Sequence, residues 1–130
     1  MFITHLKLKN WRNFRNVDVT FKDVTYIMGP NASGKSNFLD VFRFLRDIAN
    51  PQGGGLQQAL ESRGGMSKVR CLAARNNPQI MVEVELSENF EANPLWRYTL
   101  EIRQESTGKH AVYVSRETVV SLAENKTLLS

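Results

Sequence analysis

The fold is decided by residues 24–37, which read Val-Thr-Tyr-Ile-Met-Gly-Pro-Asn-Ala-Ser-Gly-Lys-Ser-Asn. The first five residues, from Val24 to Met28, are an apolar, β-branched run, which predicts a strand buried on both faces. Gly29 then opens the pattern Gly, four residues, Gly-Lys-Ser, which is typical of a phosphate-binding loop. We expect a helix to begin where this pattern ends, so that strand, loop and helix follow in the order that the motif requires.

Each fixed position of this loop has a physical role. Glycine at Gly29 and Gly34 lets backbone N–H groups approach an anion closely. Lys35 is expected to contact the β- and γ-phosphates and is the predicted catalytic residue, while the Ser36 hydroxyl is expected to bind Mg²⁺. The following helix adds the positive end of its dipole. The predicted ATP-binding residues of this segment are Gly29, Pro30, Asn31, Ala32, Ser33, Gly34, Lys35, Ser36 and Asn37.

Alternating hydrophobicity predicts a pair of strands before the loop, over residues 2–9 and 17–21. After the loop, apolar residues recur at three- and four-residue spacing and predict a helix that ends at Asn50-Pro51. The predicted apolar face of this helix consists of Phe38, Val41, Phe42, Leu45, Ile48 and Ala49. Its opposite face is expected to be solvated, with weak Asp40–Arg43 and Arg43–Asp47 pairs.

The remainder of the chain predicts a loop-rich segment followed by an antiparallel meander. Residues 56–60 have the spacing of a two-turn helix between glycine-rich stretches. Alternation returns at residues 80–86 and 96–102, and less clearly at 112–114, with turn residues between them. The predicted fold class is therefore α/β, a P-loop lobe with a mixed sheet and an antiparallel β extension. Four basic residues of the loop-rich segment are either a DNA contact or a solvated loop: Arg63, Lys68, Arg70 and Arg75.

Composition is that of one globular domain. The chain has 130 residues, of which 42% are hydrophobic and 23% charged. A net charge of +4 suits an anionic partner such as a nucleotide or nucleic acid. The single cysteine, Cys71, excludes an internal disulfide. The sequence contains no export signal and no apolar segment of membrane-spanning length, which predicts a cytoplasmic protein without membrane contact.

Three features near the start of the chain occur in a fixed order: the pair Trp11-Arg12, a strand over residues 17–21, and a loop that reads Gly-Pro-Asn-x-Ser-Gly-Lys-Ser-Asn. In this order they resemble the opening of the SMC, RecF and OLD group of ABC-type ATPases, over about residues 2–49. The later Arg63-Gly64-Gly65 and the meander look like the bacterial AAA-type ATPases of that group. Some of these serve in DNA repair, in chromosome maintenance or in phage defence, so DNA is a candidate partner, while the sequence does not decide whether DNA binds.

The resemblance also implies how the nucleotide is held. In such families two heads dimerise and enclose ATP between them, which implies a homodimer of heads. It makes Arg12 a candidate phosphate or base contact, with a surface charge as the alternative. Trp11 is either a neighbour of the nucleotide or a core anchor. The glutamine that senses magnesium in such heads could be Gln57, Gln58 or Gln79.

Two departures from the family pattern bear on activity. Ala32 stands where these loops often have glycine, and its small side chain is compatible with negative φ. The chain also lacks an apolar run ending in Asp-Glu and a Leu-Ser-Gly-Gly signature. Because phosphoryl transfer requires an oriented water and charge stabilisation, we expect residues 1–130 to bind ATP but to hydrolyse it poorly.

The simplest interpretation is an incomplete head, the N-terminal lobe of a longer ATPase. Two alternatives are a small-molecule kinase, with its acceptor site in residues 50–78, and a non-catalytic interaction module that retains a nucleotide pocket.

Overall fold

The computed structural model describes residues 2–12, 14–21, 35–49, 55–70, 79–105 and 107–129, with the backbone alone at residues 35–37 and 129. The predicted strand over residues 24–28 and the loop over residues 29–34 lie outside the described residues.

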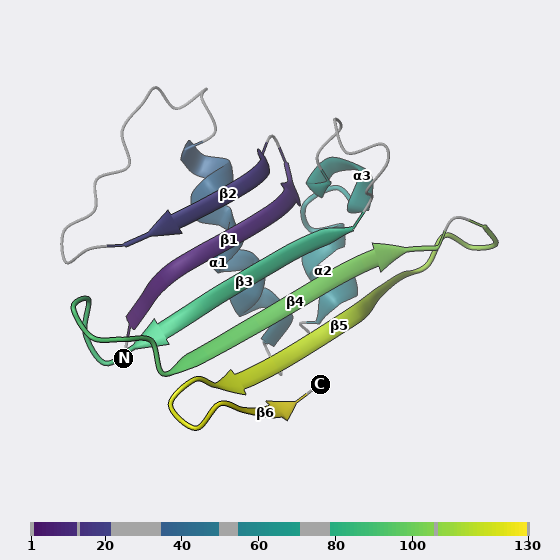
Figure 1. Ribbon diagram of the computed structural model, residues 1–130. Helices are drawn as coiled ribbons and strands as arrows, with labels where there is room; N and C mark the ends of the chain where they lie inside the picture. Colours follow the sequence, from purple (N-terminus) through teal and green to yellow (C-terminus); the bar gives the residue numbers. More distant parts are fainter. Residues whose placement is uncertain are drawn as a thin grey trace.

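The described strands form one six-stranded sheet in the order β2-β1-β3-β4-β5-β6 (Figure 1). Every neighbouring pair is antiparallel, so the described sheet is antiparallel rather than mixed. The predicted strand pair and the meander are confirmed, although the last part of the chain contains more strand than alternation suggested. The strands are β1 (Phe2–Trp11), β2 (Phe14–Thr20), β3 (Ile80–Ser87), β4 (Trp96–Gln104), β5 (Val112–Ser121) and β6 (Lys126–Leu129).

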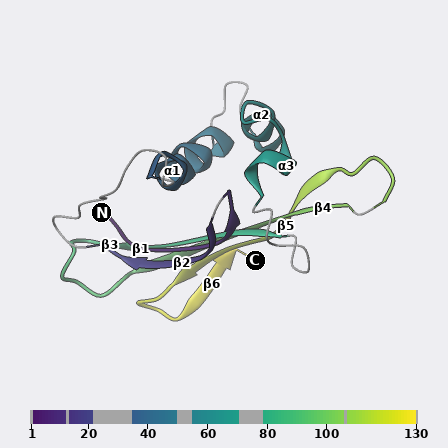
Figure 2. The ribbon, with the colours of Figure 1, turned by 90° about the horizontal axis from the view of Figure 1, so that it is seen from above.

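The described helices lie on one face of this sheet, as the view from above shows (Figure 2). They are α1 (Lys35–Ala49), α2 (Leu56–Glu61) and α3 (Met66–Val69). The first two confirm the predicted helices, and the α/β class is confirmed with them. Among the described residues, no helix combines the length and the apolar character needed to cross a membrane.

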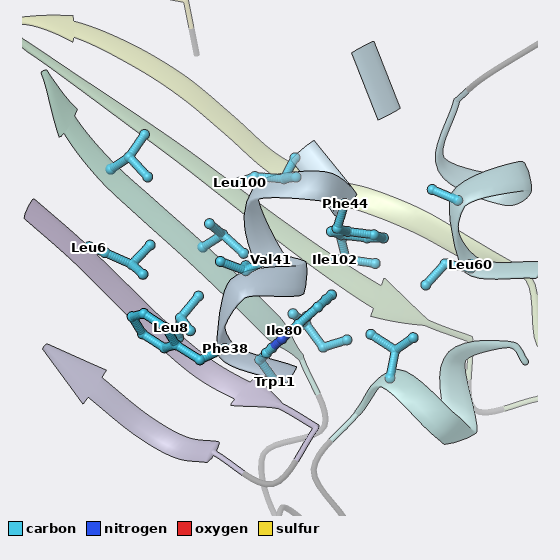
Figure 3. Close-up of a cluster of buried hydrophobic side chains, with 14 of the residues drawn as sticks. Leu6, Leu8, Trp11, Phe38, Val41, Phe44, Leu60, Ile80, Leu100 and Ile102 are labelled. Carbon is cyan, nitrogen blue, oxygen red and sulfur yellow. The ribbon is translucent and has the colours of Figure 1, made fainter. Parts of the chain in front are cut away.

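The hydrophobic core lies between α1 and the sheet (Figure 3). Alternation on β1 and β3 directs Leu6, Leu8 and Val82 toward the helices, where each is at most 1% exposed. The helix contributes Val41 and Phe44, both fully buried. The predicted apolar face of α1 omitted Phe44 and included Ala49, which is exposed. The most buried side of the helix is instead centred on Val41, with Phe38 and Phe44 three residues before and after it.

The opposite face of the sheet is polar and charged. His5 of β1 lies between Asp18 of β2 and Glu85 of β3, at 2.5 and 3.3 Å. Glu85 also accepts a hydrogen bond from Arg97 of β4 at 3.0 Å, and Lys7 lies 3.9 Å from Glu83. Cross-strand pairs of opposite charge stabilise antiparallel sheets modestly and keep such a face hydrated. The sheet therefore has an apolar face under the helices and a charged face away from them.

Candidate functional site

The backbone of α1 begins at Lys35, which confirms the predicted start of the helix at the end of the phosphate-binding pattern. Its first residues are therefore at the positive end of the helix dipole. Ser36 and Asp40 are four positions apart and share one face of the helix, separated by about 6 Å along its axis. Of the predicted site, Gly29, Pro30, Asn31, Ala32, Ser33 and Gly34 and the side chains of Lys35, Ser36 and Asn37 lie outside the described residues.

Two further residues of the prediction, Trp11 at the end of β1 and Arg12 directly after it, contact α1. Asn10 and Arg12 have positive φ values of 59° and 51°, and strict alternation stops there. Trp11 is fully buried, and its ring centroid lies 4.9 Å from that of Phe44. Trp11 is therefore a core anchor. The backbone N–H of Arg12 donates to the carbonyl of Val69, which ties this turn to α3.

Arg12 is held by a carboxylate of α1. Its Nη2 donates to Asp40 Oδ2 at 2.8 Å, and the two side chains are 21% and 17% exposed. Within the described residues, Arg12 Nε is buried and has no hydrogen-bond partner. Because a guanidinium has five N–H donors, this side chain retains donors for an anionic ligand. Arg12 is thus a fixed charge close to the start of α1 and not a free surface charge.

Asp40 is shared with a second arginine. Arg63 Nε donates to Asp40 Oδ2 at 2.9 Å and Arg63 Nη2 donates to Oδ1 at 3.1 Å, so Arg63 contacts both carboxylate oxygens. The same Nη2 donates to Asp47 Oδ2 at 3.0 Å. Asp47 also accepts from the neighbouring Arg46. The result is a network of charge-assisted hydrogen bonds along one face of α1.

Arg63 is held by packing against a ring as well as by its ion pairs. Its side chain is 9% exposed, its guanidinium lies 5.3 Å from the centroid of the Phe44 ring, and Nη1 donates to the carbonyl of Ala59. The turn that directs it to α1 is formed by two glycines with φ of +91°. Gly64 N–H donates to Glu61 and Gly65 N–H to Leu60, the Schellman pattern that ends α2.

The electrostatics of the network favour the ionised forms. Burial raises the pKa of Asp40, but the hydrogen bonds and charges of Arg63 and Arg12 outweigh it and lower the pKa below its usual range. Burial lowers the pKa of Arg63, but its hydrogen bonds to Asp40 and Asp47 outweigh burial and raise it. Asp40 and Arg63 are therefore both charged near neutral pH.

This network corrects two predictions. The pairs Asp40–Arg43 and Arg43–Asp47 were expected on a solvated face, but both carboxylates pair with Arg63 instead. Arg63 was expected either to contact DNA or to lie in a solvated loop, and its buried pairing excludes both. Neighbour spacing on a single helix could not show these contacts, because the partner comes from a separate turn. The only sequence signal was the Arg63-Gly64-Gly65 triplet itself.

The three candidate glutamines are not distinguished by their contacts. Gln57 donates its amide to the carbonyl of Val112 at 2.9 Å, and the Gln79 carbonyl accepts from Asn10 at 2.7 Å. Gln58 lies exposed on α2. In the described part of the chain, no cluster of His, Cys, Asp or Glu side chains could hold a metal ion. The prediction that Ser36 binds magnesium concerns a side chain outside the described residues.

The helix α1 begins within the Gly-Lys-Ser pattern, and Arg12 is fixed beside it. The family described as "AAA domain, putative AbiEii toxin, Type IV TA system" matches residues 24–127. The chain belongs to this family, within the SMC and RecF-like group of ABC-type AAA ATPases.

Among similar proteins are two that are named DNA replication and repair protein RecF. The protein from Roseiflexus castenholzii (strain DSM 13941 / HLO8) is 28% identical over 99 residues, which cover 70% of this chain and 25% of the relative. The protein from Bacillus mycoides (strain KBAB4) is 28% identical over 89 residues, which cover 68% and 24%. The chain therefore spans about a quarter of the length of these relatives.

Proposed function

We propose that this chain binds Mg·ATP as the nucleotide-binding lobe of a RecF-like ATPase. The phosphates bind to backbone N–H groups of Gly29, Asn31, Ala32, Ser33 and Gly34 and to Lys35. Pro30, which has no N–H, and Asn37 belong to the same nucleotide-binding segment. Ser36 binds Mg²⁺, and Arg12 supplies a second positive charge. Hydrolysis requires residues that position water. The Asp-Glu and Leu-Ser-Gly-Gly patterns that would supply such residues do not occur in this sequence.

The observation that carries this proposal is the placement of Arg12. Its guanidinium is fixed 2.8 Å from Asp40, on the helix face that Asp40 shares with Ser36 one turn earlier. An ATP polyphosphate at the N-terminus of α1 would lie between the helix dipole and this guanidinium. Both contributions are positive, so the site favours a polyanion over a neutral ligand.

The biological setting is also a proposal. The similar proteins from Roseiflexus and Bacillus are named for DNA replication and repair, and the chain carries a net charge of +4. We propose that the complete ATPase acts in DNA repair, chromosome maintenance or phage defence. In it, two heads would pair around ATP, and DNA is the proposed anionic partner.

Isothermal titration with Mg·ATP tests the binding site. Lys35→Ala removes the cation expected at the β- and γ-phosphates, and the loss of a desolvated charged contact costs about 2 kcal/mol or more. We expect Kd to rise about 30-fold or more. Lys68→Ala is the matched control, because Lys68 is an exposed lysine on α3. Circular dichroism and the melting temperature establish that both variants fold. Equal ATP affinity in the two variants would remove the proposal.

A further inference from the structure

We propose that Arg63 is a positioning residue for ATP binding, because it occupies both oxygens of Asp40 and thereby leaves the Arg12 guanidinium available to phosphate. This inference rests on the proposed function and concerns the same site. It assigns the turn between α2 and α3 a role in nucleotide affinity.

The division of Asp40 between two arginines is unequal. Arg63 makes a two-pronged contact, with Nε on Oδ2 at 2.9 Å and Nη2 on Oδ1 at 3.1 Å. Arg12 makes a single hydrogen bond to Asp40, from Nη2 to Oδ2 at 2.8 Å. Two-pronged guanidinium–carboxylate contacts are the stronger type. Asp40 therefore fixes the position of Arg12 without neutralising it fully.

The rigidity of Arg63 maintains this division. Its Nη2 also donates a hydrogen bond to Asp47 and its Nη1 donates one to the Ala59 carbonyl. Its Cζ lies 5.3 Å from the centroid of the Phe44 ring. At 9% exposure the side chain has little room for another rotamer. The ion pairs of the network join two carboxylates to three arginines. Asp40 pairs with Arg12 and Arg63, and Asp47 pairs with Arg63 and Arg46.

Loss of Arg63 would free both carboxylate oxygens of Asp40 for other hydrogen bonds. The carboxylate, with both oxygens free of Arg63, can rotate and take Arg12 in a two-pronged pair of its own. A phosphate would then have to compete with Asp40 for the same donors. Partly exposed pairs of this kind are worth up to about 1 kcal/mol, so ATP affinity should fall by about three- to fivefold.

The test is titration of the folded 130-residue chain with Mg·ATP in a double-mutant cycle. We expect Arg63→Gln to raise Kd about three- to fivefold. Arg12→Gln should raise Kd on its own, and adding Arg63→Gln to it should cause no further change. The matched control is Arg46→Gln, which removes an exposed arginine from Asp47 without touching Asp40 and should leave Kd unchanged.

The charge of Asp40 is tested by rescue. Arg63→Gln combined with Asp40→Asn has no net charge change and removes the competing carboxylate, so it should restore the original Kd. Asp40→Asn alone, with Arg63 retained, should bind ATP at least as tightly as the unmodified chain, because an amide oxygen still accepts one hydrogen bond from Arg12. This variant keeps the test decisive should Arg63→Gln fail to fold.

A purely structural role for Arg63 gives a different pattern. The Arg63→Gln effect would then persist in the Arg12→Gln background, and Asp40→Asn would weaken binding too. Either result overturns the inference but leaves the proposed function intact. An unmodified chain that binds no Mg·ATP would remove the proposed function and this inference together.

Discussion

Phe44→Leu is the perturbation that best tests how the arginine network is supported. Phe44 is fully buried, with the Trp11 ring at 4.9 Å and the Arg63 guanidinium at 5.3 Å. The aromatic pair contributes about 1 kcal/mol and a desolvated cation–π contact about 1–2 kcal/mol. Leucine retains most of the apolar volume, so we expect a loss of about 2–3 kcal/mol in the free energy of unfolding.

Urea denaturation measures this loss as a lower midpoint at an unchanged m-value. A total stability of about 5–15 kcal/mol leaves the variant folded. Phe2→Leu is the matched control, because Phe2 also stacks on a ring, that of Phe90 at 5.0 Å, but is 49% exposed and should lose less than about 1 kcal/mol. If Phe44→Leu cost no more than this control, the ring would not support Arg63 and the packing argument would fail.

Three further predictions follow from other contacts. The lowered pKa of Asp40 stabilises the folded chain at pH values above the unfolded pKa, about 3.9, and this stabilisation is lost as pH falls through the folded pKa. Acid titration of Asp40→Asn should therefore show a shallower loss of folding stability below about pH 4 than the unmodified chain shows. Gly64→Ala should destabilise the chain by about 1–2 kcal/mol in thermal unfolding, because φ is +91° and the added Cβ would lie 3.0 Å from Lys68 Cγ; an unchanged melting temperature would contradict this. Burial and the hydrogen bond to Glu117 raise the pKa of Tyr98, so its ultraviolet titration, isolated by difference against Tyr98→Phe, should occur above the ordinary value of about 10 while the chain remains folded.

Local patterns predicted most of the elements. Period-two alternation located β1, β3 and β4, and the three- and four-residue spacing located α1. Alternation did not predict the full length of β5 or the existence of β6, because β5 is exposed along most of its length and so lacks a regular apolar parity. β6 has four residues, too few for a period to be recognised.

The candidate site was predictable only in part. The Gly-Lys-Ser pattern and the placement of Arg12 near α1 depended on sequence motifs, and the helix start at Lys35 agrees with them. The sharing of Asp40 between Arg12 and Arg63 was not predictable. It depends on a chain turn 23 residues away that brings a guanidinium onto α1, and single-helix spacing rules do not include such a partner.

The two faces of the sheet differ in what can pack against them. Covering the outer face would require Glu83, Glu85 and Arg97 to leave water, and removing paired charges from water costs more than the weak pairs on that face return. A further layer of protein over the described part of this outer face is therefore disfavoured. The helices cover the other face of the sheet, and the same side of the molecule holds Arg12, Asp40 and the first turn of α1.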